Sequence, residues 1–261
     1  MDINYHKKII EITAWLKKSV SDAGFQDVIL AVSGGIDSAV ATTLAVKALG
    51  KEHIYAFLLP NGKMSAQATT DAKLLLHSLG LSKNHIVQKD ISKIFNKISK
   101  LVIASESKQS QIERVRLGNI MARLRMLFLY DMAKSLNALV VGTENKSEWY
   151  LGYFTRFGDE ASDIEPILNL YKTQIFEMAK VLGIPEEIIN KAPTAGLWEG
   201  QTDEKEFGFS YKDGDRVLYH YFDEGLPEEG IVALGIEKKI VSAVLKRVKD
   251  NDFKHKLPKI F

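Results

Sequence analysis

The stretch Val28-Ile29-Leu30-Ala31-Val32-Ser33-Gly34-Gly35-Ile36-Asp37-Ser38 joins an apolar run to a glycine turn. The run is short and rich in β-branched residues, which is typical of a parallel strand buried on both faces. Behind the turn, the alanine-rich residues 39–49 predict a helix, and Gly50 is placed to end it. The sequence therefore predicts a strand, a tight turn and a helix in direct succession.

The same alternation of predicted strands and helices continues along the chain. Further strands are predicted at residues 54–59, 86–87 and 139–141, and helices at residues 3–20, 65–79, 91–104, 112–136, 171–182, 217–222 and 236–249. Strands that alternate with helices of ten or more residues predict an α/β fold: a Rossmann-like parallel sheet flanked by helices on both faces. Ligands of such sheets bind beyond the carboxyl ends of the strands.

The remaining segments contain no recognisable linker. Residues 105–111, 144–170 and 191–216 are expected to be loops, because they are polar or rich in turn residues. Compact domains rarely keep loops this long without a use for them. We expect a single domain over residues 1–261.

Composition excludes several kinds of chemistry. The 261 residues include no cysteine, which removes thiol nucleophiles, iron–sulfur clusters and cysteine zinc sites. A net charge of +2 gives no electrostatic reason to expect nucleic acid or a membrane as a partner. No apolar run approaches the ~18–20 residues that span a bilayer, and the N-terminus has no signal-peptide pattern. A cytoplasmic location is expected.

The glycine turn itself suggests an anion site. Gly34 and Gly35 let the backbone approach a ligand closely, and the N–H groups at the start of the next helix attract a phosphate. Asp37 is unfavourable beside a phosphate unless a cation lies between them, so it is a candidate magnesium ligand. The alternative is a plain strand–helix turn in which Ser33 or Asp37 only caps the helix.

The hexapeptide Ser33-Gly34-Gly35-Ile36-Asp37-Ser38 resembles the signature of the N-type ATP pyrophosphatases, enzymes with an adenine nucleotide alpha hydrolase-like fold that split ATP between its α and β phosphates. Further matches follow in order: Gly142-Thr143-Glu144-Asn145-Lys146-Ser147-Glu148, Gly152-Tyr153-Phe154-Thr155-Arg156-Phe157-Gly158-Asp159, Lys172-Thr173-Gln174, Ala192-Pro193-Thr194-Ala195-Gly196-Leu197-Trp198 and His255-Lys256. Over essentially its whole length the chain is similar to the ammonia-dependent NAD synthetases.

This resemblance implies an activity and a set of site residues. The activity is ATP-dependent amidation of deamido-NAD by ammonia, with Mg²⁺ as cofactor, in a homodimer. The residues implied for ATP are Ala31, Val32, Ser33, Gly34, Gly35, Ile36, Asp37, Ser38, Thr143, Lys172 and Thr194; those for Mg²⁺ are Asp37 and Glu148. Arg123, Arg156, Asp163, His255 and Lys256 are implied for deamido-NAD, and Asp37, Lys172 and Asp159 for catalysis.

Two positions depart from the family pattern. Glu160-Ala161-Ser162 puts an acid where the family has small residues, and Arg156 stands where many relatives have lysine, which changes the geometry of the charge.

Each of these residues also has an ordinary structural interpretation. Glu148 can be a solvated acid beside Lys146, and Arg123 a surface arginine on the helix face that it shares with Asn119. Asp159 and Asp163 can be turn residues, and His255 and Lys256 part of a solvated tail. Lys172 at a helix start conflicts with the helix dipole, a conflict that an anionic ligand would resolve.

Two other functions remain open from the sequence: a tRNA-modifying ATP pyrophosphatase, and a nucleotide-binding module without catalysis. Near-neutral charge disfavours the first, and the joint presence of Asp37, Glu148, Lys172 and Thr194 disfavours the second. Glutamine-using relatives carry an amidase domain with a cysteine nucleophile. Because this chain has no cysteine, we expect free ammonia to be its nitrogen source.

Overall fold

A computed structural model describes residues 3–102, 110–198, 200–256 and 260 of the chain. Its sheet contains the strands β1 (Asp27–Ala31), β2 (Ile54–Leu58), β3 (Ile86–Gln88) and β4 (Ala138–Val140). They lie in the order β3-β2-β1-β4, and every pairing is parallel. The predicted α/β architecture is confirmed, and each strand begins and ends within one residue of its expected bounds.

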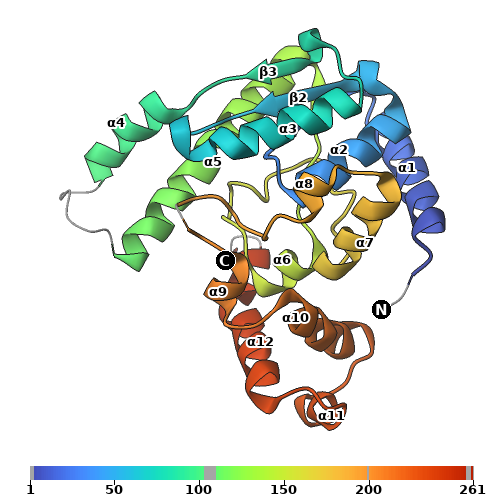
Figure 1. Ribbon diagram of the computed structural model, residues 1–261, viewed down its shortest axis with the longest axis vertical. Coiled ribbons are helices and arrows are strands. Elements are labelled where there is room, and N and C mark those ends of the chain that lie inside the picture. Colours follow the sequence, from blue (N-terminus) through green and yellow to red (C-terminus); the bar gives the residue numbers. More distant parts are fainter. Residues whose placement is uncertain (1–2, 103–109, 199, 257–259, 261) are drawn as a thin grey trace.

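Helices cover both faces of this sheet (Figure 1). Val28 and Leu30 of β1 pack in one apolar cluster with α1 (Tyr5–Asp22), α2 (Ile36–Leu49), α3 (Ala66–Ser78) and α7 (Lys172–Leu182). Ile29, between them, packs on the other face with α5 (Gln111–Leu136), beside which lies α4 (Ser92–Val102). Successive side chains of a strand point to opposite faces, so a strand covered on both sides is apolar throughout.

A second group of helices lies away from the sheet, at the lower end of Figure 1. It comprises α10 (Tyr211–Leu218), α11 (Glu228–Ala233) and α12 (Lys238–Asn251), with a π-helical turn at Tyr219–Asp223 and a 3₁₀ turn at Asp252–His255. These helices share an apolar cluster with α6 (Lys146–Leu151) through Leu151, Val217 and Val241. The C-terminal part of the chain is thereby attached next to the carboxyl end of β4.

The structure corrects two of the expected loops. Residues 144–170 contain α6, and residues 191–216 contain α9 (Asp203–Phe207) and most of α10; α8 (Glu186–Ile189) and α11 were not predicted either. Helices of one or two turns show too little periodicity to be read from a sequence, and tertiary packing stabilises them. The loop expected at 105–111 lies outside the described residues, except for residues 110 and 111. The helix expected at 91–104 is described only as far as residue 102.

The order of the strands places the ligand site. The chain runs outward from β1 to β2 and β3, then returns to add β4 on the other side of β1. Crevices at such a reversal, beyond the carboxyl ends of the strands, are where open α/β sheets bind ligands. Here the turn at 33–38 leaves β1 and Thr143 follows β4. Among the described residues, no helix is long and apolar enough to cross a membrane.

Candidate active site

A cavity of about 310 Å³ opens at this reversal, between the turn after β1, the end of β2 and helix α5. One wall is polar, and Phe57, Leu59, Met126 and Leu129 give the other an apolar character. The predicted site residues in its lining are Ala31, Val32, Ser33, Gly35, Ile36, Asp37, Ser38, Thr143, Glu148, Asp159, Lys172 and Thr194. The fold thus gathers almost all of the predicted ATP and metal residues around one space.

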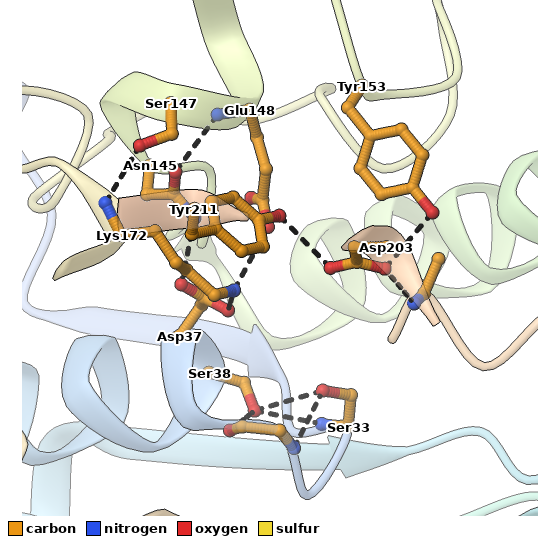
Figure 2. Close-up of polar contacts among 12 residues, drawn as sticks. Ser33, Asp37, Ser38, Asn145, Ser147, Glu148, Tyr153, Lys172, Asp203 and Tyr211 are labelled. Atoms are coloured by element: carbon orange, nitrogen blue, oxygen red, sulfur yellow. Dashed lines mark hydrogen bonds and ion pairs between the residues drawn. The ribbon is translucent and has the colours of Figure 1, made fainter. Parts of the chain in front are cut away.

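The two glycines of the turn have different tasks. Gly34 has a φ of +79°, and a Cβ there would lie 2.1 Å from the carbonyl oxygen of Ala68, so it allows the turn to pack on the start of α3. Gly35 has a φ of −91° and lines the cavity. Ser33 and Ser38 hold the turn: Ser38 Oγ donates to Gly35 O at 2.9 Å, and Gly35 N donates to Ser33 Oγ at 3.2 Å (Figure 2).

Asp37 is not a helix cap. The N-cap of α2 is Gly35, without any side-chain hydrogen bond, and the Asp37 carboxylate extends instead toward α6 and α7. Its Oδ2 lies 2.5 Å from the ammonium of Lys172, which also reaches Glu148 Oε1 at 3.2 Å (Figure 2). The side chain of Lys172 is only 3% exposed, so one nearly buried cation joins two carboxylates from separate helices.

Asp37, Lys172 and Glu148 form a trio of charged side chains, and the surroundings raise the pKa values of Lys172 and Glu148. Burial by itself would lower the pKa of Lys172, but the carboxylates of Asp37 and Glu148 raise it above its usual value, so the ammonium stays charged. Burial raises the pKa of Glu148 to about 8, against the opposing effect of Lys172. The single Lys172 ammonium therefore offsets only part of the effect of burial on the Glu148 carboxylate.

Neighbouring residues hold the trio in place. Asn145 caps α6 by accepting from Glu148 N at 3.0 Å, and its Nδ2 donates to Asp37 Oδ1 at 2.9 Å. Ser147 Oγ accepts from Lys172 N at 2.8 Å, and Asp215 Oδ2 accepts from Thr173 N at 2.8 Å. The first turn of α7 therefore has a carboxylate of its own at the positive end of its dipole, which explains how it tolerates Lys172.

The residues predicted for the dinucleotide lie beside the cavity rather than in its lining. Arg123 on α5 donates to the carbonyl of Arg156 at 3.1 and 3.3 Å, and the guanidinium of Arg156 donates to the carbonyl of Lys256. On the same face of α5, Asn119 accepts from Thr155 Oγ1 at 2.8 Å. The helix face that Arg123 shares with Asn119 thus receives the 155–156 segment.

The C-terminal segment is docked, not solvated throughout. His255 Nε2 lies 2.7 Å from the carbonyl of Trp149, and its ring centroid lies 4.6 Å from that of Trp149. The ammonium of Lys254 donates to the carbonyls of Gly152 and Phe154 at 2.6 and 2.8 Å. These contacts bring His255 and Lys256 next to Arg156.

Asp159 and Asp163 contact different parts of the structure. Asp159 Oδ1 accepts from Thr155 N at 2.9 Å and lines the cavity. Asp163 Oδ2 accepts from Val140 N at 2.8 Å, and Val141 forms a parallel bridge with Ile164. Asp163 therefore supports the end of β4, as a turn residue would, and stands apart from the Arg123 group in its contacts.

Several residues of the site have no counterpart in the sequence predictions. Tyr153, Asp203 and Arg125 line the cavity, and Tyr211 lies under Lys172, with 5.3 Å between the ammonium and the ring centroid. Glu144 is also in the lining, and its buried Oε2 has no hydrogen-bond partner among the described residues. These residues stand in segments with no motif of their own or, like Glu144, within a motif whose other members carry the expected chemistry.

The donor set suits a magnesium ion that phosphate oxygens complete. Within the described part of the chain, no group of three or more histidine, aspartate or glutamate side chains could hold a metal. Asp37 and Glu148, however, already share one cation, the Lys172 ammonium, and both offer hard carboxylate oxygens. Mg²⁺ is commonly bound by one or two carboxylates together with substrate phosphates.

The chain is similar to known proteins over nearly its whole length. The family model described as NAD synthase matches residues 8–258. The NH(3)-dependent NAD(+) synthetase of Thermococcus kodakarensis is 43% identical, over 98% of this chain and 97% of that protein.

Two solved structures are also similar. The NMN synthetase of Francisella tularensis has a TM-score of 0.83 and 34% identity, covering 100% of this chain and 99% of that one. The NH3-dependent NAD synthetase of Campylobacter jejuni, in complex with the nitrate ion, has a TM-score of 0.81 and 32% identity, covering 99% of this chain and 100% of that one. Because a family model matches nearly the whole sequence, the chain belongs to the NAD synthase family.

Proposed function

We propose that this protein amidates deamido-NAD with ammonia at the expense of ATP, producing NAD, AMP and pyrophosphate, the final step of NAD biosynthesis. The name of the Thermococcus kodakarensis relative supports the activity. The observation that carries the proposal is the meeting of the 33–38 turn, Lys172, Asp37 and Glu148 around one cavity. A glycine turn at a helix start suits a triphosphate, and the apolar wall formed with Phe57 and Leu129 suits a flat base.

The chemistry requires activation of a carboxylate. Direct amination of a carboxylate would expel oxide, a very poor leaving group. In the proposed reaction the nicotinate carboxylate attacks the α-phosphorus of ATP and pyrophosphate leaves. Ammonia then attacks the acyl carbon of the adenylate, loses a proton, and AMP leaves with the bonding electron pair.

The residues of the chain bind and neutralise the phosphates. The Lys172 ammonium and the backbone N–H groups of the 33–38 turn would stabilise charge that develops on them. Asp37 and Glu148 would hold Mg²⁺, which when bound supplies further neutralisation of phosphate charge. We assign Thr143 and Thr194 to ATP as well, and Asp159 to catalysis at the edge of the cavity that it lines.

The dinucleotide would occupy the region beside the cavity. Arg123, Arg156, His255 and Lys256 are contiguous there through the hydrogen bonds between Arg123, Arg156 and the C-terminal segment. Two arginines and a lysine suit a pyrophosphate. We retain Asp163 as a proposed substrate residue. A homodimer, a cytoplasmic location and a single domain over residues 1–261 stay predictions.

The test is an assay of both products. Purified protein is incubated with deamido-NAD, ATP, Mg²⁺ and ammonium, and NAD and AMP are followed together; we expect them in equal amounts. Replacing ammonium by glutamine should abolish NAD formation, because the chain has no cysteine to release ammonia from it. ATP binding without AMP release would instead favour a non-catalytic module, and a tRNA-dependent AMP release would favour the RNA-modifying alternative.

The Francisella tularensis neighbour raises a second candidate substrate. That protein is named for the mononucleotide NMN, and its structure covers this chain completely. The same amidation applied to deamido-NMN would give NMN. Running both acids in competition decides between them: we expect kcat/KM to favour the dinucleotide, and a preference for the mononucleotide would reassign the substrate.

A further inference from the structure

The carboxylate of Asp203 lies at the centre of a network that joins three other segments of the chain (Figure 2). Asp203 is the first residue of α9 and is 2% exposed. Its Oδ1 accepts from Tyr153 Oη at 3.0 Å and from Ala195 N at 3.1 Å, and its Oδ2 accepts from Tyr211 Oη at 3.0 Å. Three donors compensate the cost of burying this carboxylate, so its position is closely defined.

Two of these donors, Tyr153 and Ala195, line the cavity. Residues 193–197 all line the cavity, and Thr194 is among them. Asp203 N donates to Pro193 O at 3.1 Å, the Asp203 side chain accepts from Ala195 N, and Gln201 Oε1 accepts from Leu197 N at 2.8 Å. The backbone of residues 193–197 is thus hydrogen-bonded to residues 201–203, mainly through the buried side chains of Asp203 and Gln201.

The same side chains are anchored to the C-terminal helices. Glu206 Oε1 accepts from Gln201 Nε2 at 2.7 Å and from Tyr153 Oη at 3.1 Å. The guanidinium of Arg247 on α12 lies 5.4 Å from the Tyr153 ring and 4.7 Å from the Phe207 ring. The wall around Thr194 is therefore tied to α12 through Asp203, Tyr153 and Arg247.

The second carboxylate oxygen of Asp203, Oδ2, is linked to Lys172 through Tyr211. Tyr211, whose hydroxyl donates to it, presents its ring to the Lys172 ammonium at 5.3 Å. Asp203 is also among the carboxylates whose charge favours the ammonium form of Lys172. A single carboxylate therefore contacts the wall that carries Thr194 and the tyrosine that supports Lys172, on two sides of the same cavity.

We propose that Asp203 is a positioning residue for the nucleotide, which fixes the 193–197 wall through Ala195 N–H and the Lys172 ammonium through Tyr211. Asp203 itself need not touch ATP. Its loss would allow the wall and the ammonium to move independently, so that ATP binds to fewer well-placed groups. This inference rests on the proposed function, because it takes the cavity to be the ATP site.

The test measures ATP binding in Asp203→Ala, Asp203→Asn and Tyr211→Phe. We expect Asp203→Ala to raise both the Kd and the KM for ATP by about tenfold or more, and Tyr211→Phe by about threefold to tenfold, because one or more charge-assisted hydrogen bonds are lost. Asp203→Asn keeps an oxygen for Ala195 N–H, so it should fall between the wild type and Asp203→Ala. Tyr219→Phe is the matched control: Tyr219 lies in the turn that follows α10, its ring packs near Tyr171, and we expect no change.

A second readout needs no ligand. In the ligand-free protein, amide hydrogen exchange in the 193–197 segment should accelerate in Asp203→Ala, relative to the wild type and Tyr219→Phe. A merely structural role predicts a lower melting temperature and less active protein, with unchanged KM and Kd for ATP in the folded fraction, and that result overturns the inference. If Asp203→Ala fails to fold, Tyr211→Phe decides by the same criterion. A wild type that binds no ATP would overturn the proposed function, whereas unchanged exchange in Asp203→Ala would overturn the positioning role by itself.

Discussion

The ammonium of Lys172 lies 2.5 Å from Oδ2 of Asp37, although 135 positions separate the two residues along the chain. Each stands in the first turn of a helix, Asp37 on α2 and Lys172 on α7, and the two helices pack together in the apolar cluster on one face of the sheet. The packing of two helices thus determines the separation of two charges. Since both side chains are largely buried, neither charge is well solvated alone.

Replacing Lys172 by methionine should damage both activity and stability. The substitution keeps much of the side-chain volume but leaves Asp37 and Glu148 without their shared cation. Loss of one charge-assisted contact to phosphate predicts a fall in kcat/KM of roughly tenfold to a hundredfold. Breaking a buried ion pair from one side also costs about 3–5 kcal/mol of folding free energy. Steady-state kinetics and denaturant unfolding measure the two effects.

Lys180→Met supplies the control on the same helix. Lys180 pairs with Glu177 at the surface, where both side chains are more than half exposed, so its removal should cost below about 1 kcal/mol and leave kcat/KM unchanged. Equal effects of the two substitutions would contradict a special role for Lys172.

The adjacent glycines of the turn should respond differently to alanine. Gly34→Ala places a Cβ 2.1 Å from the Ala68 carbonyl oxygen at a φ of +79°, so we expect a loss of about 2–4 kcal/mol in the free energy of unfolding. Gly35→Ala brings its Cβ no closer than 3.3 Å to Ser33 Oγ, and its φ is negative. It should shift the melting temperature by no more than about 2 °C. Because its Cβ narrows the cavity, however, it should raise the Kd for ATP. Thermal unfolding and calorimetric titration with ATP measure the two quantities, and a Gly35→Ala protein that binds ATP like the wild type would place the nucleotide elsewhere.

The sheet and its flanking helices could be predicted because their signals are local. The continuous apolar run at β1 requires cover on both faces, and the turn that contains Gly34 joins two elements that are adjacent in the chain, β1 and α2. Helices α6, α8, α9 and α11 could not be predicted in this way. Each has four to six residues and depends on tertiary contacts, such as that between Leu151 of α6 and the cluster around Val217 and Val241.

The residues of the candidate site likewise fall into two groups, those with a signal in the sequence and those without one. Asp37 stands in a turn whose residue types indicate phosphate and metal chemistry, the family resemblance implies Glu148 and Lys172, and the structure brings the three together. Asp203 acts through contacts that form only in the folded chain: Tyr153 is 50 positions away, and Ala195 and Tyr211, although only eight positions away, stand in other segments. No periodicity or spacing in the sequence indicates that a carboxylate there accepts from two tyrosines.

Glu165 should make stability depend on pH. It accepts from Ser162 Oγ at 2.7 Å and from Glu144 N at 3.2 Å, and burial raises its pKa to about 7 from an ordinary 4.5. The folded protein therefore binds this proton more tightly than the unfolded chain does. The resulting stabilisation is complete below about pH 4.5 and is lost as the pH rises through 7.

Glu165→Gln isolates this effect, because glutamine does not titrate and can still accept from Glu144 N–H while donating to Ser162. Between pH 4.5 and pH 8, the unfolding free energy of the wild type should fall relative to the variant by about 3 kcal/mol. Urea unfolding at several pH values measures the difference. Glu177→Gln, at an exposed position, should show a change of less than about 0.5 kcal/mol over the same range. A constant difference between the wild type and Glu165→Gln would show that folding does not shift the pKa of Glu165.

Arg123 should affect the dinucleotide and not ATP. It lies outside the lining of the 310 Å³ cavity, and its guanidinium holds the Arg156 carbonyl at 3.1 Å, next to the docked Lys256. Arg123→Met should therefore raise the KM for deamido-NAD roughly tenfold or more, since a charge-assisted contact and the support of Arg156 are both lost, with little change in the KM for ATP. Arg114→Met, on an exposed part of the same helix, is the matched control and should change neither constant. Equal increases in both KM values would mean that Arg123 acts on the whole fold. An unchanged KM for the dinucleotide would mean that Arg123 is a surface residue, whose contact with the 155–156 segment serves packing and not the substrate.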